Sequence, residues 1–282
     1  MENKSLLLQT RDLIIERLGS RLDDICIDRA VFGLFYSGVK LSTQHGGLCF
    51  TPVKEIPEAV CCPSSAKAMP LSGKLCGRSA AQYLEDVSSE NVLKRTLGIA
   101  TMNALSTFLW DEDGTQLENG KKYSIETNVD AFDVFRVDQA KPTLVVGALA
   151  PMLKRLKADS APYYVAELDK RTLKEEEYDH FVPADKSTEI IPDAGQLVIT
   201  GTTVINGTLD SLVAAANEDT EILVTGPTVS MLPDVYFDAG ITMIGGTVVT
   251  DADGSLDLLA EGGSGYHLFG KTAERFVISK PF

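Results

Sequence analysis

Two consecutive strand–turn–helix patterns constrain the fold of this chain more than any other feature. In the first, the apolar and β-branched run 197–200 predicts a short buried strand that Gly201 ends, and a helical pattern, LDSLVAAAN, follows Gly207. In the second, EILVT at 221–225 predicts a strand, and a turn at 226–228 precedes another helical pattern. Such units are typical of an open α/β sheet, which binds ligands at the carboxyl ends of its strands.

Both turns carry polar side chains where such a ligand would bind. The candidate ligand-binding residues are Thr202, Thr203, Asn206 and Thr208 in the first turn and Thr228 in the second. The free N–H groups at the start of the following helix favour an anionic or polar ligand. Thr and Asn are also ordinary helix-capping and turn-forming residues, so a purely structural role stays open.

The first half of the chain has a different pattern. Apolar periodicity predicts helices at 5–18, 79–87 and 91–110. Runs rich in β-branched and aromatic residues predict strands at 24–34, 36–43 and 47–53. Because a turn at 44–47 would join the last two strands as a hairpin, we expect a three-stranded antiparallel meander with helices packed against it.

After the charged, glycine-containing linker 111–120, strands and helices alternate. The apolar runs expected to form strands are 143–149, 163–168 and 241–244, with a last edge strand at 276–279. The expected helices include 128–137, 151–158 and 255–261, and the stretch that ends at Pro192 is expected to be irregular. Near-continuous apolar strands separated by helices predict a parallel sheet that is covered on both faces.

Composition excludes some classes of partner. The formal net charge is −14, which argues against nucleic acid because phosphate binding needs clustered Lys and Arg. No apolar run approaches the roughly 18 to 20 residues that a bilayer requires, so no membrane partner is expected. Charged residues interrupt the first 19 residues, unlike a signal peptide, and we expect a cytoplasmic protein. A homo-oligomer remains open.

The cysteines offer one candidate metal site. There are five, an odd number, and structural disulfides are not expected in a cytoplasmic protein. Cys61 and Cys62 lie together in the irregular segment 54–77, and Cys76 and His45 would complete a site after folding. Thiolates and an imidazole suit zinc, copper(I) or iron, although C-x-x-C spacing is absent. Reduced thiols that bind no metal are the alternative.

Cofactor motifs are weak. The strand that ends in VVGALAP has Gly147 alone where a dinucleotide fingerprint needs G-x-G-x-x-G, so no standard NAD or FAD site is expected. Lys74 and Arg78, in GKLCGR before a predicted helix, would supply positive charge to an anion at the domain junction. As the alternative, a Lys and an Arg at the start of a helix are ordinary surface residues.

The ordered combination of segments resembles a known family. In chain order the segments are GGLCFTPV, GKLCGRSAAQYL, LGIATMNAL, VVGALAP, LVITGTTVINGTLDSL and LVTGPTVSMLPDVYFDAGI. Together they resemble a family of uncharacterised proteins named for heavy-metal chelation, over nearly the whole chain. That family joins a domain resembling the enolase N-terminal fold to a Rossmann-like domain. The CCPSSAKAMP insert at 61–70 looks like an elaboration outside the shared pattern.

The resemblance implies an α/β chain of two domains. We expect an α+β, enolase N-terminal-like domain at 1–112 and a Rossmann-like parallel-sheet domain at 121–282. The implied site is a cleft between the two domains, and the residues that would face it are Thr202, Thr203, Asn206, Thr208 and Thr228.

Our leading hypothesis is a metal-handling protein that binds a transition metal, or a small molecule that carries one, in this cleft. Cys61 and Cys62 would be soft ligands, and the threonine-rich turns would hold an anionic or polar part. The competing hypothesis is an enzyme or sensor that binds a phosphate- or carboxylate-bearing organic ligand without metal. A third is a scaffold that assembles a metalloenzyme through its acidic surface. The sequence does not decide between a catalytic and a binding role.

Overall fold

The structure is a computed structural model that describes residues 4–56 and 68–281. One mixed sheet runs through the molecule in the order β1-β2-β3-β10-β9-β8-β5-β6-β7, and β11 pairs with both β10 and β4. Its first three strands are antiparallel, and the strands from β10 to β7 are parallel. The expected α/β class, with an antiparallel meander followed by a mostly parallel sheet, is confirmed.

The meander is sandwiched between helices. Its strands are β1 (Ile27–Phe32), β2 (Tyr36–Leu41) and β3 (Gly46–Phe50), and the helices that precede and follow it are α1 (Leu6–Leu18), α3 (Ala80–Asp86) and α4 (Val92–Asp113). A Cβ on Gly47 would meet α4, whereas one on Gly38 would meet Leu256 and Leu259 of α11 (Ala252–Ala260). The two glycines therefore allow helices to approach closely on opposite faces of the meander.

The parallel sheet is buried on both faces. Its strands are β5 (Thr143–Val146), β6 (Tyr163–Glu167), β7 (Phe181–Pro183), β8 (Gln196–Thr200), β9 (Glu221–Thr225) and β10 (Met243–Val249). In β8, Leu197 and Ile199 belong to one core cluster while Val198, on the other face, belongs to a second. This double burial explains why the strands read as continuous apolar runs rather than as an alternating pattern.

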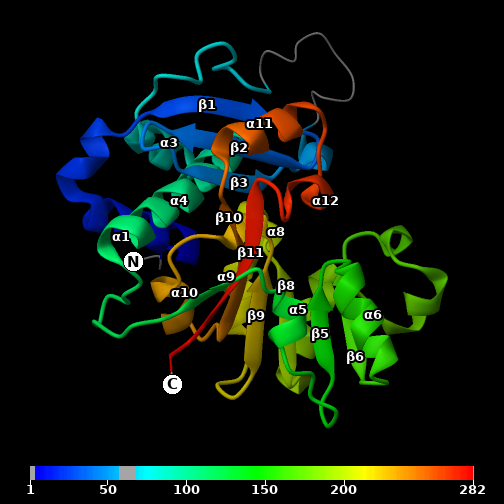
Figure 1. Cartoon of the computed structure of the whole chain (residues 1–282). Helices are drawn as coiled ribbons and strands as arrows, with labels where there is room; N and C mark the ends of the chain where they lie inside the picture. Colours follow the sequence, from blue (N-terminus) through cyan, green and yellow to red (C-terminus); the bar gives the residue numbers. More distant parts are fainter. Residues whose placement is uncertain (1–3, 57–67, 282) are drawn as a thin grey trace.

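Strand order defines where a ligand can bind. The chain passes outward through β5, β6 and β7, and then returns to build β8, β9 and β10 on the other side of β5. The direction therefore reverses between β5 and β8, which is the topological switch point of a doubly wound sheet. Figure 1 shows the meander above the carboxyl ends of β8 to β10, and Gly46 of β3 pairs there with Val249 of β10.

The remaining helices connect or cover these strands. They are α5 (Ala131–Val134), α6 (Ala150–Ala158), α7 (Ser187–Ile190), α8 (Thr202–Asn206), α9 (Leu209–Ala214), α10 (Asp234–Asp238) and α12 (Gly265–Leu268). Among the described residues, no helix is both long and apolar enough to cross a lipid bilayer.

Several expected elements differ in the structure. The helix expected at 128–137 is only the single turn α5, which Asp130 caps. The stretch before Pro192 that is expected to be irregular contains the strand β7. The strand expected at the edge is β11 (Ala273–Ser279), which lies inside the sheet between β10 and β4 (Ile125–Thr127). The turn at 201–208 contains the helix α8, although β-branched residues disfavour helices, because Val204 and Ile205 are buried there.

Candidate ligand-binding site

A cavity of about 330 Å³ lies at the carboxyl ends of the parallel strands. Its wall includes Thr200 at the end of β8, Thr225 at the end of β9, and Leu149 in the turn after β5. Tyr36 and Phe50, from β2 and β3 of the meander, line it as well. The cavity therefore spans the switch point between β5 and β8 and is contributed by both halves of the chain, as expected for a ligand site in an open α/β sheet.

Glycines allow the chain to surround this cavity closely. Gly201 and Gly226, which directly follow β8 and β9, line it, as do Gly245 and Gly246 in the middle of β10. Gly226 has φ of +131°, a conformation that residues with a side chain rarely adopt. A Cβ on Gly245 would lie 2.5 Å from the Cβ of Ala131. At these four positions the wall is therefore formed by backbone.

Several hydroxyl-bearing side chains line the cavity. Thr202 Oγ1 lies 3.3 Å from Thr200 Oγ1, and both residues line the cavity at the start of α8. Thr228 is almost fully buried, and its Oγ1 accepts a hydrogen bond from Phe50 N–H at 3.0 Å. Thr225 and Thr247 complete this hydroxyl-bearing set. These groups can donate to or accept from a polar ligand.

The turn after β9 is held from the first half of the chain. Asn103 of α4 is buried, and its Nδ2 donates to Leu48 O at 2.7 Å and to Pro227 O and Thr228 O at 3.1 Å each. One amide group therefore ties β3, α4 and this turn together. A buried and multiply bonded contact of this kind fixes Thr228 against the meander.

The charged residues of the cavity are Asp130 and Arg275. Arg275 Nε lies 3.5 Å from Asp130 Oδ2, and its guanidinium carbon lies 4.1 Å from the centre of the Phe269 ring. Burial raises the pKa of the Tyr36 phenol, and the positive charge of Arg275 opposes that rise. The Tyr36 phenol is therefore uncharged at physiological pH. It lies close enough to Arg275 for the two groups to interact electrostatically.

Of the predicted residues in the first turn, Thr202 alone lines the cavity. Thr203 is buried and donates to Thr200 O at 2.7 Å. Asn206 Oδ1 accepts from the N–H and the hydroxyl of Thr208, at 3.1 and 2.7 Å. Through these contacts, Thr203, Asn206 and Thr208 stabilise the turn itself, which is the structural role that the sequence analysis gave as the alternative to ligand binding. In the second turn, Thr228 lines the cavity.

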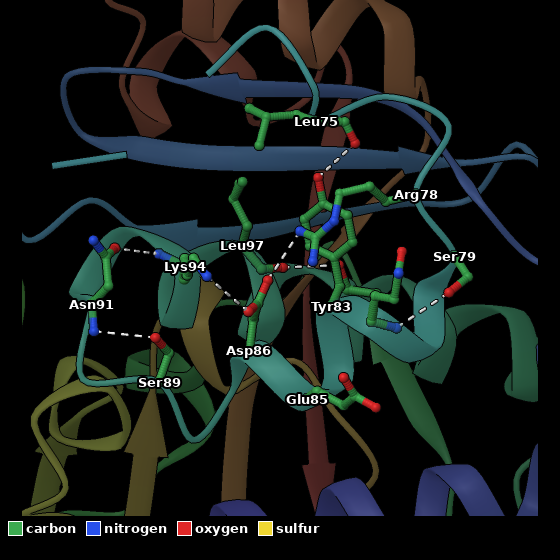
Figure 2. A network of polar contacts seen from close by, with 12 residues as sticks. Leu75, Arg78, Ser79, Tyr83, Glu85, Asp86, Ser89, Asn91, Lys94 and Leu97 are labelled. Atoms are coloured by element: carbon green, nitrogen blue, oxygen red, sulfur yellow. Dashed lines mark hydrogen bonds and ion pairs between the residues drawn. The ribbon is translucent and has the colours of Figure 1, made fainter. Parts of the chain in front are cut away.

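Lys74 and Arg78 lie away from this cavity. Figure 2 shows Arg78 against α3, where its Nη1 lies 3.0 Å from Asp86 Oδ2 and its guanidinium carbon lies 4.6 Å from the centre of the Tyr83 ring. Tyr83 in turn donates to Leu75 O at 2.7 Å. Lys74 is exposed, and neither residue lines the cavity. The charge of Arg78 is thus used to anchor the segment before α3.

The structure describes only part of the predicted metal site. Cys61 and Cys62 lie outside the described residues. Cys76 is exposed, and His45 Nε2 lies 3.0 Å from Asp111 Oδ2. Across 4–56 and 68–281, no three His, Cys, Asp or Glu side chains come together as metal ligands. The cavity offers hydroxyls and one carboxylate, a donor set that does not fit a soft heavy metal.

Sequence reasoning missed Tyr36, Phe50, Asp130 and Arg275 as cavity residues. The first two lie in the meander, Asp130 caps α5, and Arg275 lies in β11. One usable signal was present, because GG at 245–246 interrupts a strand and an interior glycine marks a close approach of another group.

Comparisons with known families agree along the chain. Residues 130–278 match the model of the DUF364 family and residues 15–106 match that of the DUF4213 family, and both carry the description "Putative heavy-metal chelation". An uncharacterised protein of Methanocaldococcus jannaschii is 28% identical over 181 residues, which are 64% of this chain and 64% of that protein. The alignment therefore spans less than two thirds of that relative.

Two solved structures share the fold. A DUF364 protein of unknown function from Pyrococcus horikoshii has a TM-score of 0.75 and 21% sequence identity, with 98% of this chain and 100% of that chain covered. A second, from Desulfitobacterium hafniense, has a TM-score of 0.71 and 20% identity, with 97% and 99% covered.

Proposed function

Because this chain belongs to the DUF364 family, whose model is named for heavy-metal chelation, we propose that it handles metal by binding a small metal-bearing organic molecule in the cavity. The observation that carries this proposal is the position of the cavity at the switch point, with Thr202 and Thr228 on its wall. Hydroxyl groups and backbone suit the polar atoms of an organic molecule better than they suit a bare soft ion.

Replacement of Thr202 with valine tests the cavity. Valine keeps the shape of the side chain but removes a hydroxyl. If a small molecule co-purifies with the protein, we expect its retention to fall about threefold to tenfold, as for the loss of one hydrogen bond. The amount of small molecule released on denaturation, measured by mass spectrometry, reports this retention.

Thr208→Val is the matched control, because Thr208 bonds to Asn206 and does not line the cavity. It should release as much small molecule as the unaltered protein does. If both variants lose the small molecule equally, or if neither loses any, the cavity is not the binding site.

Direct coordination by Cys61 and Cys62 is the second candidate, and the family description favours it. Under this hypothesis, Ser at both positions abolishes stoichiometric metal in protein purified without oxygen or an affinity tag. Elemental analysis measures the metal, and Cys26→Ser is the control. Unchanged metal in the double variant would rule out coordination by this cysteine pair.

The competing hypothesis predicts a different combination of results. Under it, the protein is an enzyme or sensor that binds an organic anion without metal. The unaltered protein would contain no stoichiometric metal, yet it would release an organic molecule whose amount falls in Thr202→Val. The same two measurements therefore separate a metal-bearing ligand from a metal-free one.

A further inference from the structure

One cation lines the cavity among the described residues, and most of its hydrogen-bonding capacity is free. The ion pair between Arg275 and Asp130 has a distance of 3.5 Å from Nε to Oδ2. Its two terminal nitrogens make no hydrogen bond to any described residue. Asp130 also has a second partner, because its Oδ1 accepts a hydrogen bond from Phe132 N–H at 3.0 Å and thereby caps α5. The guanidinium therefore has donors to offer a ligand.

The Arg275 side chain is 44% exposed, and contacts within the protein restrict it before a ligand binds. The backbone of Arg275 is fixed within the sheet, since it pairs with Thr247 and its carbonyl accepts from Asn128 N–H at 2.7 Å. The guanidinium then stacks on Phe269. An arginine that is held on both sides loses little conformational entropy when it binds an anion.

The charges around Arg275 favour a singly charged anion. Among the described residues, Asp130 is the only other charged residue on the cavity wall, and it already offsets part of the positive charge of Arg275. A phosphate dianion would need further cations or several free N–H groups. A carboxylate matches the planar fork of a guanidinium with two parallel hydrogen bonds and brings one negative charge.

The rest of the wall favours an apolar body on the same ligand. Five aromatic residues line the cavity, namely Tyr36, Phe50, Phe132, Phe269 and Phe276. Taking the cavity as the ligand site proposed above, we infer that Arg275 binds the carboxylate of a small monocarboxylate whose apolar body lies among these residues. Arg275 thereby determines specificity for the anionic group.

Benzoate and benzamide provide a matched pair of probes, since they share shape but differ in charge. With the full chain, freed of any co-purifying molecule, calorimetric titration should show benzoate binding about tenfold more tightly than benzamide, as for charge-assisted hydrogen bonds. Inorganic phosphate should bind more weakly than benzoate.

Arg275→Gln should remove the preference for benzoate and leave benzamide affinity unchanged. Arg275→Lys keeps the charge without the fork and should lose most of the preference. Arg171→Gln is the matched control, because Arg171 pairs with Asp169 on the surface and does not line the cavity. Thermal unfolding of each variant checks that the fold is intact.

The outcomes separate the role of Arg275 from the function of the cavity. Equal affinity for the two probes, or a benzoate preference that survives in Arg275→Gln, overturns the role of Arg275 while the cavity stands as a ligand site. Tighter binding of phosphate overturns the carboxylate class. Failure of both probes to bind, together with no effect of Thr202→Val on retention, overturns the cavity as a binding site and this inference with it.

Discussion

Gly47→Ala is expected to destabilise the protein more than the addition of a methyl group at any other glycine of the meander. A Cβ on Gly47 would lie 2.0 Å from Ala100 O and 2.5 Å from Ala104 N, both in the backbone of α4. A rotamer change cannot relieve contact with a helix backbone, so β3 and α4 must separate. Overpacking typically costs about 1–3 kcal/mol, and we expect a value at or above the upper end.

Circular dichroism during heating measures this effect. At about 2–4 °C for each kcal/mol in a chain of this size class, Gly47→Ala should lower the melting midpoint by about 10 °C. Gly201→Ala is the matched control, because Gly201 has φ of −59° and a Cβ there would meet its nearest atom at 3.3 Å. Equal midpoints for the two variants would mean that β3 and α4 do not pack as closely as described.

Arg17→Met is expected to have the second large effect, because it leaves a carboxylate buried without its counter-charge. The side chain of Asp234 is 2% exposed, and its Oδ1 accepts from Arg17 Nη2 and from Glu118 N–H. Removing one partner of a buried pair typically costs about 3–5 kcal/mol. Urea denaturation should show this loss as a lower midpoint with an unchanged slope.

Two further variants test that explanation. Arg171→Met breaks an ion pair whose arginine is 89% exposed, and a surface pair is worth about 0–1 kcal/mol. Combining Arg17→Met with Asp234→Leu removes both charges, and we expect most of the lost stability to return, less the hydrogen bond to Glu118. If the double variant is no more stable than Arg17→Met alone, the unpaired charge is not the cause.

The candidate site was predicted in part. The sequence identified Thr202 and Thr228 because each follows a strand and a glycine, and parallel strands present their carboxyl ends at one edge of the sheet. It did not separate them from Thr203, Asn206 and Thr208, because a hydroxyl that caps a helix and one that faces a cavity have the same local sequence. That distinction depends on which way each side chain points.

The sequence by itself determined the elements whose signals are local. Apolar periodicity and turn residues predicted α1, α4 and the meander, and continuous apolar runs predicted the buried strands β5, β6 and β8. Hydrogen bonds within a helix or a hairpin join residues close in sequence, so their patterns can be read directly.

Only the tertiary structure decided which distant segments meet. It put β11 inside the sheet, where Phe276 packs over Gly246 and pairs with Thr127. It also brought Tyr36 and Arg275 to one cavity. Pairings over such separations carry no periodic signal, because each depends on shape and charge complementarity that forms only when the whole chain has packed.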